Sequence, residues 1–163
     1  MTLTTHSIIA AAVTKPLAAF NPAFIFIAAV VSHYLSDAIP HWDYRLSSIE
    51  DAEDSDKRHW THNRNTIIND IRRFAFDGFL GAAIVLLVIR PATREQWIWA
   101  ILAIIGGSLP DFLQGLYMLK LRFLKPHQRL HDLMHSKIRL GPYPRLGIPF
   151  QTLIYASALY FLW

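Results

Sequence analysis

Four apolar stretches separated by charged turns, with a fifth at the end of the chain, are the feature that most restricts how this sequence can fold. Soluble domains of this size rarely carry so many, whereas a transmembrane helix needs about 20 mostly apolar residues. Hydrophobic residues make up 53% of the 163 residues, above the share of about 45–50% in typical soluble domains. We therefore predict an all-α, integral membrane helical bundle of four to five apolar helices plus a short amphipathic helix, forming one domain over residues 1–163.

Proline, asparagine and threonine mark the ends of the predicted helices. Asn21 followed by Pro22 is a favourable helix start, and Thr93 with Gln96 forms a capping-box pattern. Pro110 is expected to kink the fourth helix rather than end it. We expect apolar helices at about 4–20, 22–38, 66–89, 94 onward and 146–163, an amphipathic helix at about 126–137, and a long polar loop at about 41–63.

The first apolar stretch has the small residues of a signal-peptide cleavage site. However, no Lys or Arg precedes it, and Lys15 and Pro16 fall near its end, the reverse of the usual order of charge and apolar core. We expect a retained first helix that bends or stops near Pro16.

Composition excludes several classes of site. The chain has no cysteine, so any metal would be held by imidazole and carboxylate groups. The net charge is +4, but no basic helix supports a nucleic-acid partner. Serine-hydrolase and nucleotide-driven chemistry lack support, because the sequence has no G-x-S-x-G, P-loop, dinucleotide-binding or H-E-x-x-H motif.

Short connections favour helices that alternate up and down. The turns at 15–21 and 90–94 then lie at one end, and the loops at 41–63 and 119–145 at the other. All basic residues except Lys15, Arg90 and Arg94 lie on the long-loop side. The positive-inside rule therefore predicts a multi-pass protein of the cytoplasmic membrane with its long loops in the cytoplasm, in contact with membrane lipids.

Ionisable residues recur at one depth of this bundle. With a rise of 1.5 Å per residue, His6, His33, Asp37, Asp77 and Asp111 lie roughly 18–26 Å from the short-turn end. Ionisable groups at such depth pair with each other, coordinate an ion or line a wet cavity. We predict that they form a metal site.

Two further residues extend this set. His41 follows the break at Pro40 and can fold back over the face that His33 and Asp37 share, and Asp43 comes two residues later. Such imidazoles and carboxylates suit zinc first, with manganese or iron as alternatives. The simpler alternatives are that His33 and Asp37 form a structural hydrogen-bonded pair and that Asp111 caps a broken helix.

The segment HQRLHDLMHSK places His127, His131 and His135 four residues apart on one side of the amphipathic helix. This segment could supply further ligands or a general acid or base, and we take His131 or His135 as the catalytic proton donor. Alternatively, this helix lies at the interface, with its His and Arg side chains toward lipid headgroups.

The blocks THSIIAAAV, SHYLSDAIPHWDY, GSLPDF and HDLMHS resemble the signature blocks of small membrane-bound metal-dependent hydrolases of unknown substrate. That family is itself similar to helical zinc-dependent phospholipase C proteins. The resemblance implies a metal-dependent hydrolase. It carries its ligands directly to His6, His33, Asp37, His41, Asp43 and Asp111, and more loosely to Asp77 and His135.

Two main hypotheses follow. In the first, the protein hydrolyses a lipid phosphoester at the membrane, with a metal that lowers the pKa of a bound water from 15.7 toward about 7. In the second, it is a non-catalytic membrane protein whose His/Asp group is a structural metal site or an ion or proton relay. A buried hydrogen-bond network without a metal is the third possibility.

Overall fold

The computed structural model describes residues 1–50, 59–61 and 63–163, and it confirms a helical fold. A pair of two-residue antiparallel strands, β1 (Ile49–Glu50) and β2 (His59–Trp60), lies within the predicted polar loop. Residues 51–58 and 62 of that loop lie outside the described residues. The α-helices are α1 (Leu3–Thr14), α2 (Pro22–Asp37), α3 (Arg64–Ile89), α4 (Arg94–Met118), α5 (Lys125–Met134) and α6 (Pro144–Leu162).

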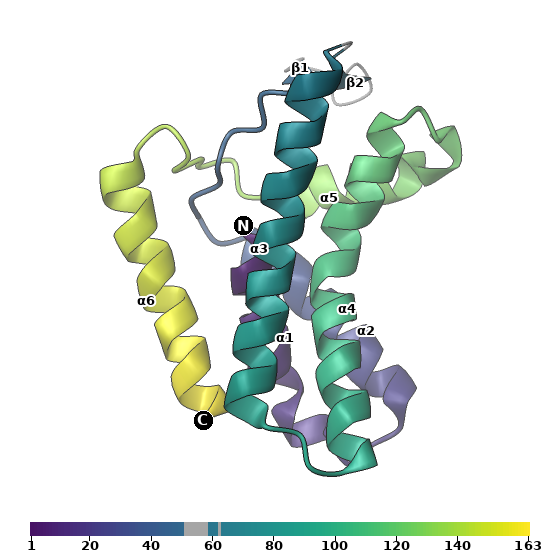
Figure 1. Cartoon of the computed structure of the whole chain (residues 1–163), viewed down its shortest axis with the longest axis vertical. Coiled ribbons are helices and arrows are strands. Elements are labelled where there is room, and N and C mark those ends of the chain that lie inside the picture. The colour runs from purple at the N-terminus through teal and green to yellow at the C-terminus, as the bar shows by residue number, and fades with distance from the viewer. Residues whose placement is uncertain (51–58, 62) are drawn as a thin grey trace.

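Helix α1 is the centre of the bundle, and it contacts α2, α3, α4 and α6 (Figure 1). The connections from α1 to α2 and from α3 to α4 lie together at the lower end in Figure 1, whereas β1, β2 and α5 lie toward the upper end. The helices thus alternate in direction as predicted. This arrangement brings the start of α1 and the end of α2 to similar heights.

Most of the predicted helix signals act as expected. The side chain of Asn21 caps α2 at Ala23, and Thr93 and Gln96 form both halves of a capping box at the start of α4. Pro110 lies inside α4. Helix α1 stops at Thr14, close to the expected break at Pro16, where the 3-10 turn η1 (Lys15–Leu17) begins, whereas α5 stops at Met134 instead of near residue 137.

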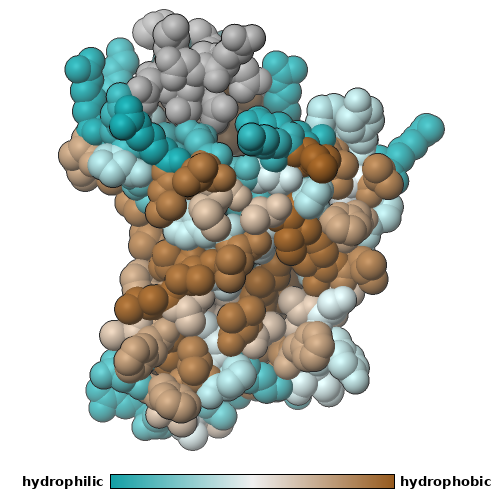
Figure 2. Space-filling model, turned by 180° about the vertical axis from the view of Figure 1, so that it is seen from behind, coloured by the Kyte–Doolittle hydropathy of each residue, from teal (hydrophilic) through white to brown (hydrophobic). Residues whose placement is uncertain are grey.

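Large apolar side chains cover much of the outer surface. On the face drawn in Figure 2, a hydrophobic band crosses the middle of the molecule and hydrophilic residues gather at both ends. Within the described part of the chain, however, α4 alone is both long and apolar enough to cross a membrane. Helix α2 is apolar but has 16 residues, and α1 has 12, both fewer than the about 20 that a span needs. A bundle of four to five spanning helices is therefore not confirmed.

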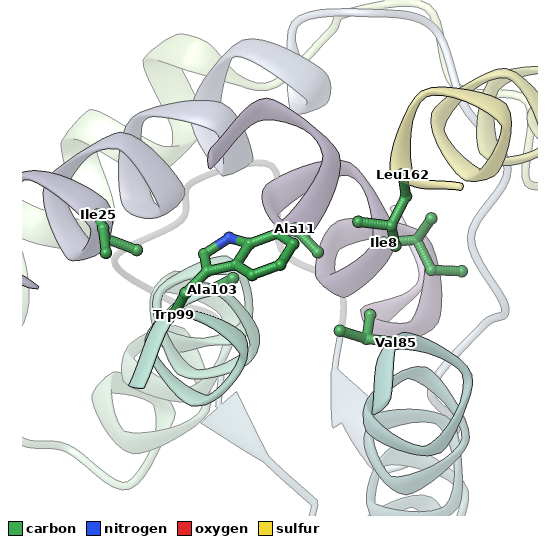
Figure 3. Packing of buried hydrophobic residues seen from close by; sticks show 7 residues of the cluster. All are labelled: Ile8, Ala11, Ile25, Val85, Trp99, Ala103 and Leu162. Carbon is green, nitrogen blue, oxygen red and sulfur yellow. The ribbon is translucent and has the colours of Figure 1, made fainter. Parts of the chain in front are cut away.

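An apolar core closes the short-turn half of the bundle (Figure 3). Trp99 is its largest side chain, and its indole nitrogen donates a hydrogen bond to Thr14 Oγ1 at 2.9 Å. The other members come from five helices, which this core holds together: Ile8, Ala11, Ile25, Val85, Ala103 and Leu162.

Two adjacent glycines let three helices approach closely above this core. A Cβ atom on Gly106 would lie 2.7 Å from Ala29 Cβ in α2, and one on Gly107 would lie 2.8 Å from Ala10 Cβ in α1. Such small-residue contacts are typical of helices that pack backbone against backbone. Helices α1 and α2 are thereby held against α4 near the residues predicted to bind metal.

Candidate metal centre

Asp37, the last residue of α2, is the point at which the predicted site residues meet. Its carboxylate is 1% exposed. Its Oδ1 lies 3.2 Å from His6 Nε2, and its Oδ2 lies 3.2 Å from His33 Nε2, one helical turn earlier in α2. The predicted convergence of α1 and α2 on one pocket is therefore confirmed for these three residues.

Helices α4 and α5 complete the group. Asp111 Oδ1 lies 3.6 Å from His33 Nε2 and 3.3 Å from His131 Nε2, and His131 Nε2 lies 3.5 Å from Asp37 Oδ2. We call His33, Asp37, Asp111 and His131 the inner cluster. One donor atom from each of its four residues falls within 4.8 Å of all the others, so that the set could surround a single ion.

Hydrogen bonds on the far side of the rings determine which nitrogen carries the proton. His33 Nδ1 donates to the carbonyl oxygen of Gly107 at 2.7 Å, which leaves Nε2 as a bare acceptor. Ser36 gives its one hydroxyl proton to the carbonyl of His33 at 2.8 Å, so its oxygen must accept from His6 Nδ1 at 3.1 Å. His6 Nε2 is therefore a bare acceptor as well.

In their neutral forms, His6 and His33 turn bare imidazole nitrogens toward carboxylate oxygens, which are also acceptors. His6 Nε2, His33 Nε2, His131 Nε2 and Asp37 Oδ2 are all buried without a hydrogen-bond partner. Unpartnered buried acceptors are costly, and a cation among them removes that cost. The donor set, imidazole nitrogen with carboxylate oxygen, fits zinc or another borderline divalent ion.

His131 is oriented by α4. The side-chain amide of Gln114 contacts His131 Nδ1 at 3.2 Å. The contacting atom is the amide nitrogen of Gln114, which only donates, so His131 Nδ1 accepts, and in the neutral ring His131 Nε2 carries the proton that faces Asp37 and Asp111. Sequence analysis placed His131 as a proton donor, whereas the structure places it among the potential ligands. The four-residue spacing of His127, His131 and His135 had left a ligand role open as the alternative.

A second group lies beside the first, nearer the surface. The backbone nitrogen of Ser136 donates to the carbonyl of Asp37 at 2.8 Å, and that of Leu140 donates to the carbonyl of His41 at 3.2 Å. This pairing aligns the chain after α5 with the chain after α2 and brings the rings of His41 and His135 to 4.7 Å. We call Asp37, His41, His135 and the neighbouring Asp43 the outer cluster.

Charge in the outer cluster is balanced by a cation. The α-amino nitrogen of Met1 lies 3.0 Å from Asp37 Oδ1, 2.9 Å from Asp43 Oδ1 and 2.8 Å from His41 Nε2. Burial opposes the charge of this amine, yet the Asp43 and Asp37 carboxylates raise its pKa to about 10. Partial burial would raise the pKa of Asp43, but the amine's charge and the contact with His41 hold it well below its usual range. Burial lowers the pKa of His135, which favours its neutral, metal-binding form.

Asp77 belongs to neither cluster, contrary to its predicted role as a ligand. Its two carboxylate oxygens accept hydrogen bonds from the backbone nitrogens of Leu3 and Thr4 at 2.6 and 3.2 Å, and Thr4 Oγ1 donates to it at 2.7 Å. A carboxylate in this position caps the start of α1. Tyr44 Oη also donates to it at 3.4 Å, and burial together with the Asp77 charge raises the pKa of Tyr44.

The remaining predicted residues are placed as follows. His33, Asp37 and Asp111 belong to the inner cluster and His6 contacts it through Asp37 and Asp111, whereas His41, Asp43 and His135 meet at the outer cluster. Comparison with family models, with curated proteins and with solved structures finds no match to this chain. The resemblance to membrane-bound metal-dependent hydrolases therefore remains a prediction from the short sequence blocks.

Proposed function

We propose that the protein is a metal-dependent hydrolase of the membrane that acts on a lipid phosphoester. The observation that carries this proposal is the inner cluster, where His33 Nε2, His131 Nε2 and Asp37 Oδ2 are buried without a hydrogen-bond partner and donor atoms of all four residues lie within 4.8 Å of one another. A divalent ion held there would supply positive charge that polarises a phosphoester and lowers the pKa of a nearby water.

The accessibility of the site favours catalysis over a purely structural metal. Asp111 is 15% exposed, His135 22% and Asp43 42%, while His6 and His33 are buried. The group is thus open on the side of Asp43 and closed on the other side by the apolar core of Figure 3. A catalytic metal needs such an open side, whereas a structural one is enclosed by protein ligands. The same apolar core argues against a relay of ions or protons through the bundle.

The chain's own residues have separable roles in this proposal. His33, Asp37, Asp111 and His131 would hold the ion, and His6 would support them by stacking on His33 and by contacting Asp37. His135 lies outside the inner cluster, nearer the surface, where the predicted role of proton donor to the leaving group remains open to it.

Exposed apolar stripes support a membrane location. In α2, Phe24, Ile27, Val31 and Leu35 recur at helical spacing and are each about half exposed or more. Exposed apolar side chains also follow α3, α4 and α6. A soluble surface normally carries such residues singly, whereas here they form continuous apolar areas. In the proposed orientation the long loops with most of the basic residues lie in the cytoplasm.

An apolar groove beside the inner cluster supports a lipid as the substrate. The groove holds about 180 Å³ and is lined by Val31, Tyr34, Leu35, Leu130 and Met134. The ring of Tyr34 packs against the rings of His33 and His131 at centroid distances of 5.6 and 6.2 Å. An acyl chain in this groove would leave its phosphorylated headgroup next to the inner cluster.

The test uses the full chain purified in detergent, loaded with Zn²⁺ or Mn²⁺ and washed. We expect metal-dependent release of the headgroup from phospholipids in mixed micelles, with little release from a soluble phosphate ester without an acyl chain. His33→Ala should abolish it, whereas His127→Ala, which changes a histidine outside both clusters, should not. A folded wild-type protein without bound metal would refute the proposal, and bound metal without hydrolysis would leave a structural metal site in its place.

The membrane location is tested separately, by extraction of cell membranes with alkaline carbonate. The chain should remain in the pellet. Its release into the soluble fraction would refute a membrane-embedded bundle while leaving the metal site standing.

A further inference from the structure

Helix α5 has two faces of different character. His131 is 3% exposed and belongs to the inner cluster. Leu133 is 80% exposed and Leu130 is 45% exposed, and Arg129 is exposed beside them. At about 3.6 residues per turn, Leu133 points to roughly the opposite side of the helix from His131. The helix therefore turns a potential ligand inward and an apolar and basic face outward.

The chain on both sides of α5 continues this outward face. Phe123, in the 3-10 turn η3 (Arg122–Leu124), is 76% exposed, and Leu119 and Ile138 are 60% and 63% exposed. Asp132 is the one acidic residue in the sequence between 119 and 145. We call the exposed apolar and basic residues of this segment the α5 surface: Leu119, Lys120, Leu121, Arg122, Phe123, Arg129, Leu130, Leu133, Lys137, Ile138 and Arg139.

A surface that is both basic and apolar fits a partner that offers both anionic and apolar groups. Nucleic acid offers phosphate, but proteins that bind its single strands stack the bases on several aromatic side chains, and Phe123 is the one aromatic residue of the α5 surface. A lipid leaflet with anionic headgroups offers phosphate to the Lys and Arg side chains and an acyl boundary to the leucines. The composition of the α5 surface therefore favours an anionic lipid surface.

The position of α5 in the bundle agrees with this partner. Helix α4 runs along the bundle in Figure 1, whereas α5 crosses its upper part. An amphipathic helix at a membrane lies in the plane of the interface, which is the direction of α5 if the bundle axis crosses the membrane. Leu130 also lines the apolar groove together with Leu35 of α2, which is 59% exposed. The α5 surface is thus continuous with the apolar stripe of α2.

We propose that the α5 surface binds the anionic lipid headgroups of the leaflet at the long-loop end of the bundle, with Phe123, Leu130 and Leu133 inserted at the acyl boundary. This inference rests on the membrane location in the proposed function and adds the lipid chemistry that one surface recognises. Each Lys or Arg near an anionic leaflet strengthens the attraction about fivefold, and salt screens it. The contact would hold the helix that carries His131 at the depth of the headgroups.

The experiment measures the depth of a nitroxide label on Leu133→Cys in the full chain, reconstituted into lipid vesicles. The sequence has no other cysteine that competes for the label. In phosphatidylcholine with about 30% phosphatidylglycerol, accessibility to oxygen and to a nickel chelate should place the label about 5–10 Å into the boundary between headgroups and acyl chains. In pure phosphatidylcholine, or in about 1 M salt, the label should shift toward water.

A matched pair of double variants tests the role of the basic side chains. Arg122→Gln with Arg129→Gln removes two exposed charges from the α5 surface, and should shift the label toward water although phosphatidylglycerol is present. Arg90→Gln with Arg94→Gln removes two exposed charges at the short-turn end, and should leave the depth of the label unchanged. Circular dichroism of each variant confirms that its helices are intact.

Each other outcome contradicts a stated part of the proposal. A label that lies in water in every vesicle refutes it, and binding of single-stranded RNA that depends on Arg122 and Arg129 would then assign the surface to nucleic acid. A label equally deep in both lipid mixtures and in both double variants refutes recognition of anionic lipid. If alkaline carbonate releases the chain while the label keeps its lipid-dependent depth, the embedded bundle fails and the α5 surface stands as a peripheral anchor.

Discussion

The imidazole rings of His6 and His33 stack face to face, with centroids 3.8 Å apart and an interplanar angle of 21°, although they belong to different helices. Each Nε2 lies 3.2 Å from a different oxygen of Asp37. Two protonated rings in this arrangement would repel each other at contact distance, so the stacked pair does not hold two imidazolium ions. Neutral rings with their Nε2 atoms toward one carboxylate are the form in which histidines bind metals.

Ser36 provides a test of the contacts that orient the rings. Its hydroxyl accepts from His6 Nδ1 and donates to the carbonyl of His33. Ser36→Ala removes the partner that fixes the His6 tautomer, and loss of such outer-shell contacts typically weakens metal affinity 10–100-fold, so we expect about 10-fold here. The measurement is a metal titration by isothermal calorimetry.

Ser32→Ala is the matched control for this change. Ser32 lies one turn earlier in the same helix, is equally buried, and donates its hydroxyl to the carbonyl of Ala29 at 2.7 Å. This hydrogen bond lies within α2 and involves no histidine of the site. The metal affinity of Ser32→Ala should therefore match that of wild type. Equal weakening in both variants would show that the effect is one of packing.

Gly107→Ala is expected to separate α1 from α4. The added methyl group would lie 2.8 Å from Ala10 Cβ and 2.9 Å from the carbonyl oxygen of His6, and overpacking of this kind costs about 1–3 kcal/mol. Because the displaced segment carries His6, we expect both a lower unfolding temperature and weaker metal binding. Thermal unfolding with and without Zn²⁺ measures the two effects.

Gly115→Ala is the control on the same helix, because a Cβ atom there would meet nothing within 4 Å. Alanine is favoured over glycine inside a helix by about 0.5–1 kcal/mol, so this variant should unfold at the same or a slightly higher temperature. Destabilisation equal to that of Gly107→Ala would contradict the close approach of α1 and α4.

Asp77→Asn distinguishes a capping carboxylate from a ligand. The change places an amide group opposite the backbone N–H donors of Leu3 and Thr4, and an unsatisfied buried donor costs about 1–3 kcal/mol. We expect a lower unfolding temperature with an unchanged metal content, read by thermal unfolding and elemental analysis. A loss of bound metal at unchanged stability would restore Asp77 as a ligand.

Removal of metal should destabilise the whole bundle. An ion that binds the folded chain alone stabilises it by about 2.7 kcal/mol when its free concentration is 100 times its dissociation constant. Treatment with a chelator should therefore lower the unfolding temperature, and addition of Zn²⁺ should restore it. In His33→Ala the chelator should have little effect. An equal effect in both proteins would point to a metal bound elsewhere.

The sequence correctly predicted the position of the site along the helices, but not the direction in which every side chain points. Counting along the helices placed His6, His33, Asp37 and Asp111 at one depth, and they do meet. The same count included Asp77, which points to the first turn of α1. Depth fixes the position along a helix, whereas the rotation of α3 about its axis depends on packing that the pattern does not contain.

The role of His131 depends on tertiary structure in the same way. Helix α5 follows the 3-10 turn η3 (Arg122–Leu124), and the chain after it pairs through Ser136 and Leu140 with the backbone at Asp37 and His41, at the end of α2. No periodicity in the sequence encodes that pairing. The helix ends were more accessible to sequence reasoning: α2 ends at Asp37, close to the end expected near residue 38, and α1 stops at Thr14, near the expected break at Pro16.

Helix α5 also sets the order in which the centre can be built. His6, His33, Asp37 and Asp111 are all synthesised before His131, which comes from the last third of the chain. A nascent chain halted before α5 would carry an incomplete ligand set and should release its ion readily. Zinc that stays tightly bound would therefore show that α5 has been synthesised and has docked. The metal content of a preparation would then measure the fraction of correctly folded chains.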